Sequence, residues 1–495
     1  MRVMIQLRPS PDLAAAVADP SSKVTTADVA AGLVAELPGV ELDPAFAPVT
    51  VPRPVPRAGG DPLPLNRPLD VSLAPGDASV LVRGTIPDGE PASGVALRPD
   101  VVGVFADPVV EPSPVPVGEA PVGDWHDVER LLGVAGLHAE GLDGAGVALA
   151  VLDTGVNAAH AARRLGRAVT VDTARCWRPP DGRSVPAPGE SGVGHGTMCA
   201  FDALIAAPQA ALIDIPLLPP VLPPALSSTL SSTLSSALPP ARPDALSHAL
   251  PGGAVSAVTG GPLPGGPLPG GLLSDAVAAF AHLRGVLEAQ PAETRALVVS
   301  NSWGSFSPEG DFPAGHPGNY SDNAAHPFNL MVAALDRMGA DVLFAAGDRG
   351  RERPGGRHPF PSRPIAGANS HPRALSVGGV DVNGARLGCS SRGPGRLTAR
   401  KPDVCAYTRF AGSRAFGEGE ADSGTSAAAP VAAGLVAAVR TRWPASRLSP
   451  AQLRALLRRT AEDRSEVGFD YDYGYGTVDP GAIVAALDRR SRSAA

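Results

Sequence analysis

Apolar runs that alternate with alanine-rich stretches fill most of residues 125–487 of this 495-residue chain. The runs are apolar at nearly every position, as expected for strands that are covered on both faces. Regular alternation of strands and helices is typical of a parallel sheet with helices packed on it. The pattern therefore predicts an α/β fold, with a mainly parallel sheet and helices on both faces. The five runs are VALAVL, ALIDIPLL, ALVVSNS, DVLFAAG and ALSVGGV.

Changes in composition divide the chain into two units. Residues 1–105 contain three strand-like runs (RVMIQL, SVLVRGTI and VVGVFADPVV) and a helical stretch at 27–36, which predict a small α+β domain. Residues 106–124 are rich in proline, valine and glycine and are predicted to form a linker. The larger unit, 125–487, follows.

The larger unit is interrupted by a segment of low complexity. Residues 219–272 consist largely of short repeats of proline, serine, leucine and glycine, a composition that rarely packs into a core. We interpret the segment as a surface insertion that arose by neutral repeat expansion, with a docking arm as the alternative. Residues 488–495 are predicted to be a frayed tail.

Composition and charge exclude several classes of function. The net charge is −7 and no basic tract is present, so we expect no nucleic-acid partner. The only lysines, Lys23 and Lys401, do not follow a glycine, which excludes a GxxxxGK[ST] phosphate loop. Four cysteines without a CxxC pair indicate neither a disulfide scaffold nor a cysteine zinc site, and we identify no other metal-ligating pattern.

No stretch of the sequence has the properties of a membrane or export segment. The start of the chain, MRVMIQLRPSPD, has too short an apolar run for a secretory signal. The longest apolar run, 427–439, is too short to span a bilayer and contains Pro430. We expect no membrane partner and a cytoplasmic location, with export by an unrecognised route as the alternative.

Three stretches carry side chains suited to nucleophilic catalysis. Asp153 ends an apolar run in GVALAVLDTGVN, His195 starts a helical stretch in SGVGHGTMCA, and Ser426 opens another in DSGTSAAAP. A serine hydroxyl needs a base, histidine is that base at neutral pH, and a buried aspartate orients the imidazole. A serine at a helix N-terminus also has a backbone N–H and the helix dipole directed at a developing oxyanion. Each stretch alone is typical of an ordinary turn, loop or N-cap, so the prediction depends on all three.

These motifs carry a family resemblance. Through VLDTG, GHGTMCA, SNSWG and SGTSAAAP, residues 125–487 resemble the subtilisin-like serine peptidases (subtilases), apart from the insertion. The resemblance implies that Asp153, His195 and Ser426 form a catalytic triad. It further implies an endopeptidase that hydrolyses a protein or peptide substrate through an acyl-enzyme.

The resemblance also suggests the residues around the triad. Ser302, Trp303 and Gly304 would line the substrate cleft as an edge strand that pairs with an extended peptide. Most subtilases have a smaller residue at the position of Trp303, so we expect a reshaped cleft. Cys199, one helical turn after His195, matches a free cysteine of some subtilases and is expected to be buried and structural. Many subtilases bind structural calcium, but no loop here matches those sites, so no cofactor or metal is assigned.

The first unit resembles the inhibitory propeptide of the same family. The resemblance is carried by the strand at the start of the chain and by RPDVVGVFADPVVEP, which is similar to the final strand of that propeptide. It implies that the N-terminal domain acts as an intramolecular inhibitor, which blocks the cleft until a cut in 106–124 releases it. A permanent N-terminal domain is the alternative.

Asp348 departs from the family pattern. It ends the run VLFAAGD, where subtilases have an asparagine whose amide forms the oxyanion hole together with the backbone N–H of the serine, here Ser426. An ionised carboxylate repels an oxyanion, whereas a protonated one donates a hydrogen bond. Protonating an ordinary aspartate at pH 7 costs about 4 kcal/mol, which cancels the roughly 3–4 kcal/mol that the donor supplies in subtilisin.

Burial would raise the pKa of Asp348 and make protonation easier. We therefore expect a slow peptidase with an acid-shifted optimum. One alternative is a peptide-binding pseudoprotease that Asp348 has disabled. The other is a maturation protease with one dedicated substrate.

Overall fold

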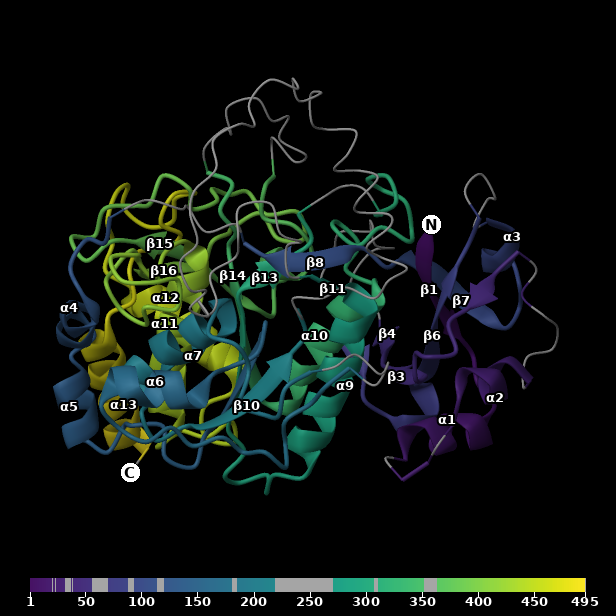
Figure 1. Cartoon of the computed structure of the whole chain (residues 1–495), viewed down its shortest axis with the longest axis horizontal. Coiled ribbons are helices and arrows are strands. Elements are labelled where there is room, and N and C mark those ends of the chain that lie inside the picture. The colour runs from purple at the N-terminus through teal and green to yellow at the C-terminus, as the bar shows by residue number, and fades with distance from the viewer. Residues whose placement is uncertain are drawn as a thin grey trace, which may run out of the picture.

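A six-stranded parallel sheet forms the centre of the larger unit, with the strand order β10-β9-β12-β14-β15-β16 (Figure 1). The computed structural model describes residues 1–494 except 20, 23, 32–36, 38, 56–69, 88–92, 114–119, 180–184, 219–269, 307–309 and 351–362. The strands are β9 (Ala148–Asp153), β10 (Ala211–Pro216), β12 (Leu297–Asn301), β14 (Ala340–Ala345), β15 (Leu375–Val380) and β16 (Val404–Tyr407). The predicted apolar runs account for five of them. The sixth, β16, is only four residues long and does not stand out as a run.

Helices cover both faces of this sheet. In β9, Leu149 and Val151 belong to one hydrophobic core, while Ala148, Ala150 and Leu152 belong to a second, because successive strand side chains point to opposite faces. The helices of the first core are α4 (Trp125–Leu131), α5 (Val134–Ala139), α6 (Ala158–Leu165), α7 (His195–Ala206), α11 (Thr425–Arg440), α12 (Pro450–Thr460) and α13 (Pro480–Ala494). Those of the second core are α9 (Leu273–Glu288) and α10 (Pro327–Met338). The predicted α/β fold is confirmed.

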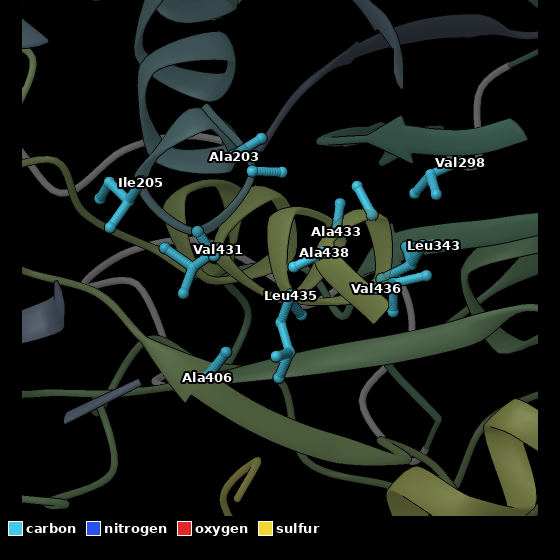
Figure 2. Packing of buried hydrophobic residues seen from close by; sticks show 14 of the residues in the cluster. Ala203, Ile205, Val298, Leu343, Ala406, Val431, Ala433, Leu435, Val436 and Ala438 are labelled. Carbon is cyan, nitrogen blue, oxygen red and sulfur yellow. The ribbon is translucent and has the colours of Figure 1, made fainter. Parts of the chain in front are cut away.

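Helix α11 runs through the first core, and all of its residues are buried. Figure 2 shows Val431 and Leu435 of α11 among residues of α7 and of the sheet, which include Ala203 and Leu343. The helix lies so close to α7 that a Cβ atom at Gly434 would be 2.0 Å from the carbonyl oxygen of Ala203. Only glycine fits this crossing. The tight packing fixes the N-terminal end of α11, which carries Ser426.

The N-terminal unit is an antiparallel sheet with the order β2-β6-β1-β7, to which β3 adds by pairing with β6. Its strands are β1 (Arg2–Leu7), β2 (Glu41–Leu42), β3 (Val49–Val51), β6 (Ser79–Thr85) and β7 (Val101–Ala106), and a separate pair is formed by β4 (Arg53–Val55) and β5 (Asp70–Ser72). Its helices are α1 (Pro11–Ala18), α2 (Thr26–Ala31) and α3 (Ser93–Ala96). The helix expected at 27–36 is α2 in its first part, and 32–36 lie outside the described residues.

The N-terminal sheet packs on α9 and α10 (Figure 1). Its apolar side chains, among them Met4 and Leu81, join the second core of the larger unit. Arg83 Nη1 lies 2.9 Å from Asp275 Oδ1 in the first turn of α9. Asp107 accepts hydrogen bonds from the backbone N–H and the hydroxyl of Ser274, over 2.7 and 2.8 Å. The contact between the two units is therefore both apolar and ionic.

Three segments differ from the boundaries that the sequence predicts. The linker expected at 106–124 contains strand β8 (Val109–Pro112). The insertion expected at 219–272 ends in strand β11 (Gly271–Leu272), while 219–269 lie outside the described residues. Helix α13 continues to Ala494 and so includes most of the residues expected to form a frayed tail, 488–495.

The described residues include no helix that is long and apolar enough to cross a membrane.

Candidate active site

Asp153 and His195 meet at the carboxyl edge of the sheet. Asp153 is the last residue of β9, and His195 is the first residue of α7. The Nδ1 atom of His195 lies 2.8 Å from Asp153 Oδ1, which also accepts a hydrogen bond from the N–H of Thr154. Both side chains are buried. A proton on Nδ1 leaves a lone pair on Nε2, and Nε2 has no hydrogen-bond partner among the described residues. With Nδ1 bonded to Asp153, the free lone pair on Nε2 allows His195 to act as a base.

Ser426 is the second residue of α11, and its hydroxyl lies 3.4 Å from the carbonyl oxygen of Ser302. Pro430, four residues further on, lacks the N–H that would bond the carbonyl of Ser426 within the helix. That carbonyl instead accepts hydrogen bonds from Ser302 Oγ over 2.9 Å and from Cys199 Sγ over 3.5 Å. Because of Pro430, the carbonyl of Ser426 is available to accept hydrogen bonds from Ser302 and from Cys199 of α7.

Cys199 lies between the three predicted triad residues. Its sulfur is 3.6 Å from Asp153 Oδ2, 3.8 Å from His195 Nδ1 and 3.5 Å from the carbonyl oxygen of Ser426. The sulfur of Cys199 thus lies within 4 Å of a side-chain atom of Asp153, a side-chain atom of His195 and the backbone carbonyl of Ser426. The cysteine is buried, as the sequence predicts.

Asp153, His195 and Cys199 also offer potential metal-ligand atoms within 4.8 Å of one another. The Nδ1 atom and the aspartate are already joined by their own hydrogen bond, however. Burial and the nearby charge of Asp153 raise the pKa of the Cys199 thiol well above its usual value. Metals bind the thiolate, so a protonated thiol is a poor ligand. This group of residues fits a catalytic pair beside a structural cysteine better than a metal site.

Asp348 follows β14 and lies against the start of α11. Its Oδ1 accepts a hydrogen bond from the backbone N–H of Thr425 over 2.8 Å. Its Oδ2 is buried and has no hydrogen-bond partner among the described residues. Gly424 has a φ of 74°, and a Cβ atom there would be 2.5 Å from Oδ2, so the carboxyl group packs on the backbone just before Ser426.

The two oxygens of Asp348 therefore differ in what they can do. Oδ1 serves as an acceptor at the helix N-terminus, so only a proton on Oδ2 would turn this side chain into a donor. Burial raises the pKa of Asp348 to about 6, although the hydrogen bonds from Thr425 and the charge of His195 oppose the rise. The sequence identifies the position, but the acceptor role toward Thr425 depends on a side-chain orientation that the sequence does not reveal.

The substrate-cleft residues predicted from the sequence pair with the N-terminal unit. Strand β13 (Trp303–Gly304) runs antiparallel to β8, with Trp303 opposite Pro112 and Gly304 opposite Glu111. The carbonyl of Ser302 accepts a hydrogen bond from the N–H of Ser113 over 3.4 Å. Ser302, Trp303 and Gly304 thus form an edge that binds an extended chain.

Strand β11 forms the opposite edge of the cleft. Gly271 faces Val110 and Leu272 faces Val109, so that β8 lies between β11 and β13. This edge was not predicted, because both residues of β11 fall within the low-complexity insertion expected at 219–272. The available signal is the change from the Pro/Gly repeats to LLSDAVAAF, an apolar helical start, directly after Gly271.

The indole of Trp303 lies in the second core, and the expectation that it reshapes the cleft stays a prediction. Its side chain is completely buried in the second core, with its ring centroid 5.6 Å from that of Phe328 and 5.5 Å from that of Phe344. The backbone of Trp303 pairs with β8. The large side chain therefore adds to the core beneath the cleft.

A histidine paired with an aspartate, together with a serine at the start of a helix, is the arrangement of serine peptidases, although His195 Nε2 and the hydroxyl of Ser426 are not hydrogen-bonded to each other in this structure. On this α/β sheet, with the order Asp, His, Ser, it is the arrangement found in subtilisin. The sequence model of the subtilase peptidase family matches residues 144–476, which is more than half of the chain. The chain belongs to the subtilase family.

Two curated relatives are similar over part of the chain. Fervidolysin of Fervidobacterium pennivorans is 26% identical over 200 residues, which are 37% of this chain and 24% of the relative. A thermostable alkaline protease of Halalkalibacterium halodurans is 29% identical over 161 residues, which are 32% of this chain and 39% of the relative. The matched stretches thus span about a quarter and about two fifths of these relatives.

Proposed function

We propose that this protein is a serine endopeptidase that hydrolyses peptide bonds through an acyl-enzyme. The observation that carries the proposal is the 2.8 Å contact between Asp153 and His195, which leaves Nε2 of the histidine unpartnered beside the helix that carries Ser426. Family membership and the similarity to a thermostable alkaline protease support the same activity.

Each triad residue has a defined step in this mechanism. The hydroxyl of Ser426 attacks the peptide carbonyl and gives its proton to Nε2 of His195, while Asp153 stabilises the imidazolium. The imidazolium then protonates the leaving amine. Water hydrolyses the acyl-enzyme by the same route. The oxyanion receives hydrogen bonds from the backbone N–H of Ser426 and from Oδ2–H of Asp348 when that carboxyl group is protonated.

The state of Asp348 sets the pH range of this activity. With a pKa of about 6, protonation at pH 7 costs about 1.4 kcal/mol, compared with about 4 kcal/mol for an ordinary aspartate. That cost is smaller than the roughly 3–4 kcal/mol that an oxyanion donor supplies. We therefore expect an active enzyme that is slowed at neutral pH and favoured toward pH 6. His195 must stay neutral to act as the base, which limits the activity on the acid side.

The N-terminal unit would act as an intramolecular inhibitor. Strand β8 occupies the space between the two edges where an extended substrate would bind. The unit is held there by the buried contact of Arg83 with Asp275 and by the bonds of Asp107 to Ser274. Protein or peptide substrates would then enter only after this unit loosens. The cytoplasmic location stays a prediction from the sequence.

Loosening the N-terminal unit provides the test. Replacing Arg83 with alanine leaves Asp275 buried without this partner, a change that typically costs 3–5 kcal/mol. Unfolded generic protein is incubated with the Arg83→Ala variant from about pH 5 to 9, beside Arg83→Ala/Ser426→Ala. The matched control is Arg53→Ala, which removes an exposed arginine of the same unit away from this contact.

Hydrolysis by Arg83→Ala that disappears with Ser426→Ala would support the peptidase, and an optimum near pH 6 would support a protonated Asp348. If the folded Arg83→Ala variant binds unfolded protein at every pH without cutting it, the pseudoprotease is favoured. If it cuts only a single cellular protein and no generic substrate, the dedicated maturation protease is favoured.

A further inference from the structure

Two buried carboxyl groups lie where helix α7 meets the segment that leads to Ser426. Asp202 follows His195 by seven residues in α7, and Asp422 precedes Ser426 by four residues. Residues seven positions apart share one face of a helix, so Asp202 lies on the same face of α7 as His195. Asp202 has no exposed surface, and Asp422 is 1% exposed. Neither side chain belongs to the triad.

Asp422 is held in place as a hydrogen-bond acceptor. Its two carboxyl oxygens accept hydrogen bonds from the backbone N–H and the hydroxyl of Ser413, each over 2.5 Å. A Cβ atom at Gly412 would be 2.2 Å from Asp422 Oδ2 and 3.1 Å from the ring of Phe201 in α7. The carboxyl group of Asp422 and helix α7 therefore meet at Gly412.

Asp202 has no such donors around it. Neither of its carboxyl oxygens has a hydrogen-bond partner among the described residues. Burial, and after it the charge of Asp422, raise the pKa of Asp202 well above its usual value. Burial also raises the pKa of Asp422 to about 6, although the bonds from Ser413, the contact with Asp202 and the charge of Arg164 oppose the rise. Of the two groups, Asp202 is the one that burial keeps neutral.

The charges around the pair can offset one anion. Arg164 of α6 donates to the carbonyl oxygen of Gly412 over 3.2 Å from Nε and 2.8 Å from Nη2, and its charge lowers the pKa of Asp422. The thiol of Cys199, on the same helix as Asp202, is neutral because burial raises its pKa well above the usual value. Other titratable side chains near Arg164 or near the loop of Gly412 are His160, Arg414 and Glu418.

The chemistry of two adjacent carboxyl groups favours one proton for the pair. Two carboxylates are both acceptors and repel each other, whereas a carboxylic acid can donate to a carboxylate. Such a bond to an ionised acceptor is stronger than a bond between neutral groups. Because both oxygens of Asp422 already accept from Ser413, the proton is favoured on Asp202.

We propose, on the basis of the peptidase function above, that Asp202 is a positioning residue for catalysis, which donates a hydrogen bond from its protonated carboxyl group to Asp422. This bond holds the helix of His195 against the segment that leads to Ser426, and so fixes the base relative to the nucleophile. Loss of the proton at alkaline pH leaves two adjacent buried anions, which push these elements apart. The pair thus sets an alkaline limit on the activity that is separate from the limit set by Asp348.

The test first removes the titration of Asp348. The parent is Arg83→Ala/Asp348→Asn, in which the proposed oxyanion donor is an amide at every pH. The kcat and KM of this parent for unfolded casein are measured from about pH 5 to 10, beside those of its Asp202→Asn, Asp202→Ala and Asp12→Asn derivatives. Asp12→Asn is the matched control, because it changes an exposed aspartate far along the chain from the pair. Circular dichroism checks that each variant is folded.

The parent is expected to lose kcat on the alkaline side, as the shared proton is lost. Asp202→Ala has no donor for Asp422, and its kcat at pH 7 is expected to fall by on the order of tenfold to a hundredfold, since a small misplacement of catalytic groups costs that much. Its KM is expected to stay unchanged, because the pair touches no substrate. Asparagine donates without titrating, so Asp202→Asn is expected to restore most of the rate that Asp202→Ala loses and to lack the alkaline fall.

The outcomes separate this inference from the proposed function. If the parent hydrolyses casein and Asp202→Asn shows the same alkaline fall, the inference is overturned. The same holds if folded Asp202→Ala keeps the kcat of the parent, or if Asp12→Asn changes the profile as much as Asp202→Asn does. If the parent has no activity that disappears with Ser426→Ala, the proposed function itself fails, and the catalytic role of Asp202 fails with it.

Thermal unfolding tests the shared proton without using activity. Because the pKa of Asp202 is raised in the folded state, its stabilising contribution is complete at acid pH and is lost as the pH rises through the raised pKa. In the Ser426→Ala background, Asp202→Asn is therefore expected to raise the melting temperature more at pH 9 than at pH 5. An equal shift at both pH values would show that no proton is held between Asp202 and Asp422.

Discussion

Two carboxylates at the same edge of the sheet behave very differently in this protein. Asp153 ends β9 and Asp348 follows β14, and each accepts a hydrogen bond from a backbone N–H nearby. Asp153 also bonds His195 and lies near the thiol of Cys199, so both of its oxygens have partners. Asp348 accepts the N–H of Thr425 through Oδ1, while its Oδ2 is buried and has no hydrogen-bond partner among the described residues.

The comparison shows that the neighbours of a carboxyl group determine its role. In the proposed mechanism, Asp153 stabilises the imidazole of His195 when the imidazole becomes cationic. Asp348 gains less from its charge than burial removes, and its pKa is raised to about 6. In the proposed mechanism, Asp153 therefore acts as an anion, whereas Asp348 acts only as a neutral acid. This difference can be tested by replacing each with the isosteric amide. All rates below refer to the Arg83→Ala background.

The largest effect is expected for Asp153→Asn. The amide cannot stabilise the imidazolium and favours the wrong tautomer of His195, and the equivalent change in trypsin-like enzymes lowers the rate about 10⁴-fold. Hydrolysis of unfolded protein at pH 7 measures the loss, and circular dichroism checks the fold. A fall of less than about tenfold would mean that Asp153 does not act on His195 during the reaction.

The opposite effect on the rate, an increase, is expected for Asp348→Asn. An asparagine donates to the oxyanion at every pH, whereas Asp348, with a pKa of about 6, is protonated in about one molecule in ten at pH 7. The variant is therefore expected to be about tenfold faster than its Arg83→Ala parent at pH 7, faster still relative to that parent at pH 8, and equal to it below pH 5. A pH–rate profile beside the exposed control Asp12→Asn gives the measurement. An unchanged or lower rate at pH 7 would refute the donor role.

The role of Asp153 could be predicted from the sequence more fully than that of Asp348, and the reason is physical. Asp153 and His195 each lie in a short motif, and their pairing follows from the positions of a strand end and a helix start. The role of Asp348 depends on which of its oxygens meets the N–H of Thr425, and that is decided by packing against Gly424. The residue was identifiable from the sequence, but the orientation of its carboxyl group was not.

The contacts of the cleft were also difficult to predict, because they join residues that are far apart in the sequence. The parallel sheet could be predicted because each strand is an apolar run of its own. The pairing of Glu111 with Gly304 joins segments far apart in the sequence, and no local pattern encodes it. The direction of the Trp303 side chain depends on which face of β13 meets Phe328 and Phe344, so the burial of the indole could not be predicted from local sequence.

A smaller effect is expected on stability. Because the pKa of Asp348 is raised in the folded state, its stabilising contribution is complete below about pH 4 and is lost as the pH rises through about 6. Asparagine keeps the bond to Thr425 without this loss. In the Ser426→Ala background, which prevents self-digestion, Asp348→Asn is expected to stabilise the protein by on the order of 2 kcal/mol at pH 7.5. No gain is expected at pH 4, and an equal gain at both pH values would show that the charge of Asp348 is not the cause.

The smallest effect on the rate is expected for a substitution of Cys199, whose sulfur lies near Asp153, His195 and the carbonyl of Ser426. Its thiol is buried and its pKa is raised well above the usual value, so it is neither a nucleophile nor a charged partner of His195. Cys199→Ala removes the single thiol hydrogen, which lies within reach of the carbonyl of Ser426 and of Asp153 Oδ2, but the stronger bond from Ser302 to that carbonyl remains. The rate at pH 7 is expected to stay within about tenfold of the parent, while the melting temperature falls by a few degrees because the change leaves a small cavity. Loss of activity as large as that of Asp153→Asn, with the fold intact, would show that the sulfur positions the triad and that the anionic role of Asp153 depends on it.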